Sequence, residues 1–174
     1  MRDTAESPAI GEGATSPSTG GMSVAAKVSV NHLRDLPPDR LADLVAESEK
    51  AGFRFLRRLV EDWESGANRY TQPGEALFAA VLGDRIVGVC GLNRDPYRCD
   101  GRVGRVRHLY VAVALRRQGI GRSLVAMVVR SACDAFARLR LRTDSEPAAR
   151  FYEVLGFRPC DDEADCTHTL DFQG

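Results

Sequence analysis

The 174-residue chain lacks a surplus of either charge, because 24 Lys and Arg residues face 24 Asp and Glu residues. Without a net field, a role in coating DNA or in anchoring to an anionic membrane is disfavoured. Apolar runs such as residues 76–82 and 123–129 fall well short of the ~18 residues that a membrane helix needs. The first 21 residues have no apolar stretch of the kind found in a secretory signal. We therefore expect a cytoplasmic protein without nucleic-acid or membrane partners.

The chain also lacks paired cysteines. Its five cysteines are odd in number and none stands in a Cys-x-x-Cys pair, which argues against a disulfide scaffold or a zinc ribbon. Cys166 and His168 are the only near pair of soft metal ligands, and on an alternating strand their side chains would share a face. Two ligands do not make a closed site. We therefore expect reduced thiols and no metal.

Length and composition fit one globular domain. The chain is 44% hydrophobic and 28% charged, which is ordinary for such a domain. Residues 1–23 are rich in Gly, Ser, Pro, Ala and Thr and have hardly an apolar anchor, so they cannot offset their own ordering entropy. We expect a disordered tail over residues 1–23 and a single domain over residues 24–174.

Hydrophobic periodicity predicts helices and strands in mixed order. The expected strands are a short one near residues 28–30, a hairpin of residues 76–82 and 85–92, and further strands over 106–113, 138–143 and 167–172. The expected helices run from about residue 39 to before Gly52, and over residues 53–63, 123–135 and 146–155. This order predicts an α+β (α/β mixed) fold, a mixed sheet with helices on both faces. Ser145 is expected to cap the last helix and Gly156 to end it.

Residues 111–122, VAVALRRQGIGR, form the most informative segment. A strand, a turn with Gly119-x-Gly121 and a helix place several backbone N–H groups at a helix N-terminus, where they bind anions. Glycine at both positions would allow positive φ and close approach of a phosphate. The segment does not match a P-loop, because it has no Lys after the glycine, and it does not match a Rossmann fingerprint, because the third glycine is missing. Positive charge beside the turn comes from Arg116, Arg117 and Arg122. The natural ligand of such a turn is a pyrophosphate.

A second segment, residues 145–157 or SEPAARFYEVLGF, carries a candidate acid. On a helix, Ser145, Ala148 and Tyr152 lie along one side. The two small residues leave a shallow groove with a phenol at its end. A phenol with a pKa of ~10 can donate a proton toward a thiolate whose pKa is ~8.5. The alternative is a half-buried aromatic ring that uses its hydroxyl only as a polar handle.

Taken together, the two segments resemble the GNAT superfamily of acyl-CoA-dependent N-acyltransferases. The run from Arg116 to Gly121 matches the family's Arg or Gln, x, x, Gly, x, Gly or Ala motif. The second segment matches the pattern Asn-x-x-Ala-x-x-Phe-Tyr-x-x-x-Gly-Phe, with Ser in place of Asn, at Ser145, Ala148, Phe151, Tyr152, Gly156 and Phe157. The resemblance covers about residues 28–172 and is strongest in the second half.

This resemblance implies a GNAT-like fold, in which a central, mostly antiparallel mixed sheet has two splayed central strands. Here these are residues 106–113 and 138–143, and the pantetheine arm of acetyl-CoA, the acyl donor, would insert between them. Main-chain groups of Leu109, Val111 and Val113 would hold the pantetheine amides and the thioester carbonyl, and Tyr152 would protonate the departing thiolate. The full set of implied cofactor-binding residues is Leu109, Tyr110, Val111, Val113, Arg116, Arg117, Gln118, Gly119, Ile120, Gly121, Arg122, Ser123, Ser145, Ala148 and Tyr152.

The implied reaction is direct attack of an amine on the thioester in a ternary complex, and the general base is its open part. Many members place a Glu early in the strand before the glycine turn, where this chain has Arg105 and Arg107. His108 is the nearest catalytic substitute, with an ordinary pKa of ~6.5. Strict alternation makes it face opposite to Arg107, on the side of Val106 and Tyr110. The alternatives are a structural histidine, a water-relayed proton path, or the weaker candidates Asp95, Tyr97 and Glu75.

The resemblance also outlines an acceptor cleft, to which Glu61, Asp62, Trp63, Glu64, Asn93, Asp95 and Tyr97 could contribute. Acidic residues there would suit a cationic amine, although a charge run on a helix is more often a solvated face. We expect an N-acetyltransferase that acts on a primary amine of a small molecule or peptide. The alternatives are an acyl-CoA-binding regulatory module without turnover, a transferase for a different acyl-CoA, or a turn for another phosphate ligand. A homodimer through exposed strand edges is a further option.

Overall fold

The computed structural model describes residues 27–99, 101–161 and 165–172. The tail expected over residues 1–23 lies outside them. None of the helices in these ranges is long and apolar enough to serve as a membrane span.

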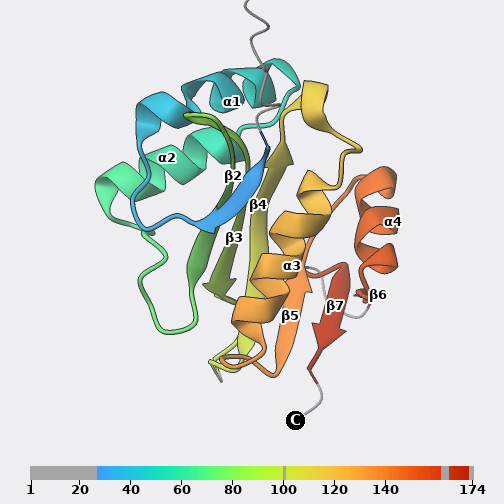
Figure 1. Ribbon diagram of the computed structural model, residues 1–174. Coiled ribbons are helices and arrows are strands. Elements are labelled where there is room, and N and C mark those ends of the chain that lie inside the picture. Colours follow the sequence, from blue (N-terminus) through green and yellow to red (C-terminus); the bar gives the residue numbers. More distant parts are fainter. Residues whose placement is uncertain (1–26, 100, 162–164, 173–174) are drawn as a thin grey trace, which may run out of the picture.

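A mixed sheet forms the centre of the molecule (Figure 1). Within the described ranges it has seven strands in the order β1-β2-β3-β4-β5-β7-β6. Only β4 and β5 pair in parallel; the other neighbouring pairs are antiparallel, as expected. The strands are β1 (Ser29–His32), β2 (Ala76–Leu82), β3 (Arg85–Arg94), β4 (Val103–Val111), β5 (Arg138–Leu141), β6 (Arg158–Pro159) and β7 (His168–Asp171).

Helices cover both faces of this sheet (Figure 1). The helices α1 (Pro38–Lys50) and α2 (Phe55–Ser65) bury one side of the core, and α3 (Ile120–Ala132) and α4 (Glu146–Val154) bury the other. On the α1/α2 face, leucines such as Leu41 and Leu59 pack with Val89 of β3. On the α3/α4 face, Leu124 packs with Val106 of β4. The helical periodicity read from the sequence therefore selects the buried faces correctly.

The β2–β3 hairpin illustrates how local sequence sets the framework. Gly83 has a φ of 63°, which favours glycine, and with Asp84 it joins two strands that pair from Leu82 and Arg85 onward. The strands bury nearly every residue on both faces, because helices cover both sides. The predicted hairpin is confirmed.

Several boundaries differ from the sequence-based expectation. The central strand begins at Val103 rather than residue 106 and ends at Val111, before a short 3-10 helix, η1 (Val113–Leu115). Its start contains Gly104, where a Cβ would lie 2.8 Å from side-chain atoms of Leu139 and Phe136, so a weak strand former is required by packing. The third helix begins at Ile120 and ends at Ala132, and β6, a two-residue strand containing a proline, was missed.

Candidate active site

A β-bulge interrupts β4 at His108. Val89 pairs with Tyr110 and Gly91 pairs with Arg107, so one residue of β3 opposes two residues of β4. His108 has a φ of 58°, in the left-handed region. Because the bulge adds a residue, Arg107 and His108 both lie on the α1/α2 face, whereas Val106 lies on the α3/α4 face. The expectation that His108 faces opposite to Arg107 is wrong, since alternation fails at a bulge.

The two central strands, β4 and β5, separate after Arg105, before β4 reaches the bulge at His108. The parallel pairing of β4 with β5 covers only three residues, from Val103 opposite Arg138 to Arg105 opposite Arg140. Past Arg105, β4 continues to Val111 without a partner strand on that side among the described residues. The splayed strands expected from the sequence are therefore present, and Leu109 and Val111 lie along the opening.

The turn from Arg116 to Gly119 presents the start of α3 to solvent. Gly119 precedes the helix with a φ of 82°, as expected, and Arg117 also has a positive φ, of 63°. Ser123 donates the first helical hydrogen bond, to Gly119 O at 3.0 Å, so the N–H groups of residues 120–122 have no partner within the helix. Gly121 is helical, so the expectation of positive φ there is wrong. A Cβ at Gly121 would lie 3.4 Å from Phe151, and its absence widens the space between α3 and α4.

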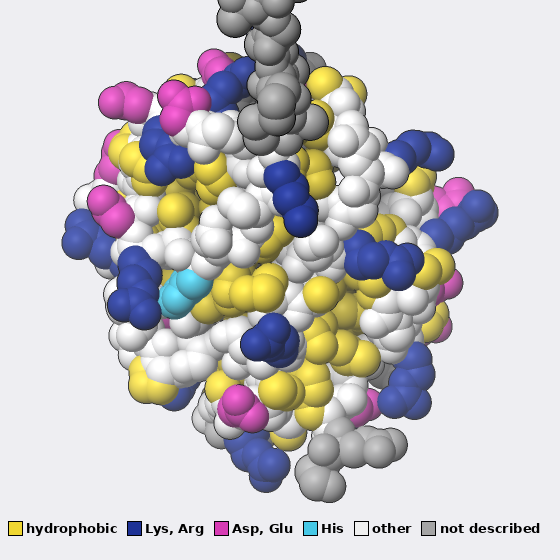
Figure 2. All heavy atoms as spheres, viewed as in Figure 1, with side chains coloured by type: hydrophobic (Ala, Val, Ile, Leu, Met, Phe, Trp, Pro, Cys, Tyr) yellow, Lys and Arg dark blue, Asp and Glu magenta, His cyan; other side chains and the backbone are white. Residues whose placement is uncertain are grey.

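Two side chains of the turn brace it against the rest of the protein. Arg116 Nε donates to Val111 O at 2.9 Å, and its guanidinium lies 5.1 Å from the centre of the Tyr110 ring. Gln118 Nε2 donates to Ala114 O at 3.5 Å. Arg117 and Arg122 are exposed. On the face that carries α3, basic side chains are dispersed among hydrophobic ones instead of forming one field (Figure 2).

Glu47 of α1, which sequence reasoning missed, reaches the same end of β4. Its Oε1 accepts hydrogen bonds from the Tyr110 hydroxyl at 3.1 Å and from Val113 N–H at 2.9 Å. Burial, and then the bond to Glu47, raise the pKa of Tyr110. The Val113 N–H expected for pantetheine thus has a protein partner in this structure. No local signal reveals this contact, because the two residues are 66 positions apart.

Helix α4 begins beside the opening. Ser145 occupies the N-cap position, as expected, but its exposed side chain makes no capping hydrogen bond. Instead its N–H donates to Thr143 Oγ1 at 3.2 Å. Ala148 is half-buried and packs against the α3/α4 core. The hydroxyl of Ser145 is therefore not used by the helix.

Tyr152 projects from α4 into the core between two phenylalanines. Its ring centre lies 5.2 Å from that of Phe151 and 5.5 Å from that of Phe157. Burial, with a smaller effect of Cys90, raises the pKa of Tyr152, so the phenol stays protonated at neutral pH. The hydroxyl has no hydrogen-bond partner among the residues that the structure describes. A hydroxyl without a protein partner can serve an incoming ligand.

His108 forms a second tyrosine contact, on the α1/α2 face. Its Nδ1 lies 2.8 Å from the hydroxyl of Tyr70, and its ring stacks on Phe55 at 6.2 Å. Tyr70 was missed by sequence reasoning, because it stands in a loop. Burial lowers the pKa of His108 to about 3, and the positive charges of Arg107 and Arg58 add to this effect. The imidazole is therefore neutral at physiological pH.

The weaker candidates for a base already have partners. Glu75 accepts backbone hydrogen bonds with both oxygens, from Arg94 N–H at 3.1 Å and from Gln72 N–H at 3.3 Å. Tyr97 is exposed, and Asp95 is ion-paired, as described below.

The other residues expected at the acceptor cleft do not lie together. Glu61 borders a cavity with three arginines of α2 and its N-terminal loop, Asn93 pairs with Asn68, Asp62 and Trp63 are half-buried, and Glu64 is exposed.

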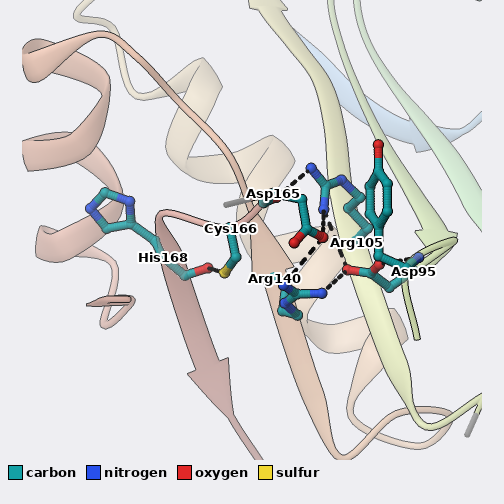
Figure 3. Close-up of polar contacts among 7 residues, drawn as sticks. Asp95, Arg105, Arg140, Asp165, Cys166 and His168 are labelled. Atoms are coloured by element: carbon teal, nitrogen blue, oxygen red, sulfur yellow. Dashed lines mark hydrogen bonds and ion pairs between the residues drawn. The ribbon is translucent and has the colours of Figure 1, made fainter. Parts of the chain in front are cut away.

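An ion cluster lies where β4 and β5 still pair (Figure 3). Asp95 Oδ2 lies 3.0 Å from Arg140 Nη1 and 3.4 Å from Arg105 Nη1. Asp165 adds a second carboxylate 3.3 Å from Arg140 Nη2, and its carbonyl accepts from Arg105 Nη2 at 2.8 Å. Arg105 also lies over the Tyr97 ring, at 5.1 Å. Two arginines and two aspartates thus compensate each other.

Cys166 and His168 do not share a face. The thiol of Cys166 lies on the side of Arg140, whereas the ring of His168 points toward α4, with Nε2 3.5 Å from Glu153 (Figure 3). The expectation of a common face is wrong, because regular pairing of β7 begins only at His168. Burial raises the pKa of the Cys166 thiol.

A family model described as an acetyltransferase (GNAT) domain matches residues 73–159, which is half of the chain. The matched region contains the bulge, the glycine turn and Tyr152. The curated protein "Uncharacterized N-acetyltransferase YsnE" of Bacillus subtilis (strain 168) is 28% identical over 105 residues, or 58% of this chain and 67% of that protein.

Solved structures share the fold. One from Exiguobacterium sp. 255-15 has a TM-score of 0.74 and 29% identity, covering 83% of this chain and 93% of that one. An acetyltransferase of the GNAT family from Staphylococcus aureus Mu50 has a TM-score of 0.67 and 19% identity, covering 84% and 100%. A GNAT family acetyltransferase from Elizabethkingia anophelis, with acetyl-CoA bound, has a TM-score of 0.54 and 18% identity, covering 83% and 98%. From the family match and the architecture built above, the chain belongs to the GNAT family of acetyltransferases.

Proposed function

We propose that this protein transfers the acetyl group of acetyl-CoA directly to a primary amine of a small molecule or peptide, in a ternary complex. The observation that carries the proposal is the opening between β4 and β5, together with the unpaired N–H groups at the start of α3 and the unpartnered hydroxyl of Tyr152. The acetyl-CoA bound to the Elizabethkingia relative supports the same donor here.

The donor would be held mainly by backbone. The free N–H groups of residues 120–122 and the dipole of α3 favour a pyrophosphate. Arg117 and Arg122 add exposed positive charge beside it. The open edge of β4 at Leu109 and Val111 would pair with the pantetheine amides, as a strand would. Arg116 would position the turn instead of touching phosphate, because its side chain is bonded to Val111 O.

The chemistry then needs one bond formed and one broken. The amine nitrogen attacks the thioester carbon, main-chain donors near Leu109 stabilise the oxyanion, and the carbon–sulfur bond breaks. The departing thiolate receives a hydrogen bond and then a proton from Tyr152, and solvent, which takes up the proton lost by the amine, returns a proton to Tyr152. The raised pKa keeps Tyr152 protonated until the thiolate forms.

The attacking amine must lose a proton, and His108 is a poor acceptor for it. An imidazole with a pKa of about 3 binds protons only weakly at neutral pH. We assign His108 the role of a neutral residue that, with Tyr70, shapes the floor beside the thioester. The proton would leave through a water-relayed path toward solvent.

Calorimetric titration with acetyl-CoA tests the donor, with ADP and NAD as controls. We expect micromolar-range binding, about 8 kcal/mol of association free energy, for acetyl-CoA only. Equal affinity for ADP or NAD would favour a general phosphate site. No binding would remove the basis of the proposal.

Release of free CoA thiol in the presence of an amine panel tests turnover. Because no carboxylate replaces the usual Glu near His108, a regulatory acyl-CoA-binding module is the second candidate. Binding of acetyl-CoA without thiol release for any amine would favour that module. Faster release with a longer acyl-CoA would revise the donor and retain the enzyme.

A further inference from the structure

A polar cavity of about 270 Å³ lies on the α1/α2 side of the sheet, beside the bulge. Its walls come from the loop after α2, from the end of β3 and from the middle of β4. Asn68 and Asn93 form part of it and bond to each other reciprocally, at 3.1 and 3.0 Å. These amides satisfy each other and hold the two walls together.

The charges of this cavity do not balance. Its titratable residues are three arginines and one glutamate, Arg69, Arg94, Arg107 and Glu75. Glu75 accepts two backbone hydrogen bonds, while Arg69 Nε and Arg94 Nε donate to the carbonyls of Trp63 and Pro73. The cavity therefore carries a net positive charge that its single carboxylate does not neutralise.

Arg107 is the unpartnered member of this group. The residue is half-buried, and its guanidinium forms no hydrogen bond or ion pair with any residue that the structure describes. Arg105, on the same face of the same strand, has Asp95 and the main chain of Asp165 as partners. A guanidinium without a counter-charge at the edge of a polar cavity can bind an anionic ligand through charge-assisted hydrogen bonds.

The bulge places this guanidinium next to His108, two residues before Leu109, where the proposed thioester would lie. Arg107 directly precedes His108, and both lie on the α1/α2 face. Arg58 of α2 brings a second positive charge near the same imidazole, and it too has no side-chain partner among the described residues. An acceptor whose amine lies at the opening near Leu109 would thus place a neighbouring group against Arg107.

We propose that the acceptor is a primary amine that also carries a carboxylate, and that Arg107 binds this carboxylate. The inference rests on the proposed function and names the class of its acceptor. Guanidinium and carboxylate match in shape, since two parallel N–H groups can meet two oxygens. The acidic residues of α2 would then form a solvated face, the more common of the two interpretations of the sequence, and would not select a cationic substrate.

A paired panel tests this inference. Amino acids with different side chains are supplied as free acids and as their carboxamides, and kcat/KM for acetylation is measured by thiol release. We expect the wild type to prefer the free acid of its best substrate by ~10-fold to 100-fold, the value of a charge-assisted hydrogen bond. Equal kcat/KM for acid and amide would overturn the inference, as would acetylation of no free acid in the panel.

The variant Arg107→Gln isolates the guanidinium from differences in amine basicity between acids and amides. It should reduce the acid-to-amide ratio to near one, mainly through a higher KM for the acid. Arg107→Lys should restore part of the preference. Arg130→Gln, which removes an exposed arginine from α3, is the matched control and should keep the wild-type ratio. An unchanged ratio in Arg107→Gln would overturn the inference.

Calorimetry on the same samples separates the two proposals. If the wild type does not bind acetyl-CoA, the proposed function itself is refuted. Normal acetyl-CoA binding together with acetylation of amines regardless of a carboxylate would refute only the role of Arg107. Thermal unfolding of Arg107→Gln, expected to match the wild type, shows that the variant is folded.

Discussion

Arg105 and Arg107 occupy neighbouring positions on one face of β4, yet their surroundings differ. Arg105 lies in an ion cluster with Asp95, Arg140 and Asp165, where each charge has an opposite charge nearby. Arg107 borders a solvent-open cavity and has no such partner among the described residues. The first arrangement is complete within the chain, whereas in the second the guanidinium borders an open cavity, where the proposal places a ligand.

The same distinction applies to other polar groups along the sheet. Asn68 and Asn93 satisfy each other, whereas the hydroxyl of the buried residue Tyr152 has no described partner. Substitution of a group with protein partners should lower stability. Substitution of a group without them should lower binding or turnover and leave stability almost unchanged.

Asp95→Asn should produce the largest change in stability. It removes the charge that the fully buried Asp95 side chain presents to Arg140 and Arg105. Leaving buried guanidinium charge uncompensated costs about 3–5 kcal/mol. Chemical denaturation measures the free energy of unfolding. A loss below about 0.5 kcal/mol, typical of surface substitutions, would show that the cluster is not a structural element and would break the comparison.

Tyr152→Phe should produce the largest change in turnover. Removing the phenolic proton donor should lower kcat by about 100-fold, because the thiolate then leaves unprotonated. The affinity for acetyl-CoA and the free energy of unfolding should stay close to the wild type, since the hydroxyl has no described partner to lose. Thiol-release kinetics and calorimetry provide the measurements. A variant that turns over at the wild-type rate would leave Tyr152 as a packing residue only.

The pH dependence of stability tests the lowered pKa of His108. This residue has one protein partner, Tyr70, and also lies beside the proposed site. In the folded state its pKa is lowered from 6.5 to about 3 by burial, then by Arg107 and Arg58. Between these values the unfolded chain binds more protons, so the free energy of unfolding falls as the pH falls below about 6.5. From pH 7 to pH 5 this one residue accounts for about 2 kcal/mol.

The comparison is between wild type and His108→Asn, since asparagine accepts the left-handed φ of this position. Denaturation at pH 7 and at pH 5 should show a smaller loss for the variant, by about the same 2 kcal/mol. Groups other than His108 cancel in the difference. Identical losses in both proteins would mean that His108 titrates normally in the folded state.

Arg117→Gly should have the smallest effect, with opposite signs for stability and binding. A non-glycine residue at φ 63° carries strain of about 1 kcal/mol, which glycine would relieve. The greater entropy of glycine in the unfolded state offsets part of this gain in stability. We expect the free energy of unfolding to rise by about 0.5 kcal/mol. The affinity for acetyl-CoA should fall a few-fold as positive charge beside the pyrophosphate is lost. Tighter binding by the variant would exclude a role for this arginine.

Much of the framework could be predicted because its causes are local. The buried stripes of α1 and α2, the β2–β3 turn and the glycine before α3 follow from residue spacing and backbone preference. The position of Tyr152 on α4 follows from the same periodicity. Boundaries were less certain, since Gly104 lies in a strand only because Leu139 and Phe136 leave no room for a Cβ.

The details of the site depended on contacts between distant residues. The sequence by itself determined the order of elements, the glycine turn before α3 and the family, because spacing, helix capping and glycine geometry act within a few residues. Only the tertiary structure decided that a bulge turns His108 to the side of Arg107, that Glu47 meets Val113, and that Asp95 compensates Arg105 and Arg140. Strand register and the loops that cross the sheet bring these groups together. The local sequence therefore does not predict that Arg105 pairs with a carboxylate and that Arg107 does not.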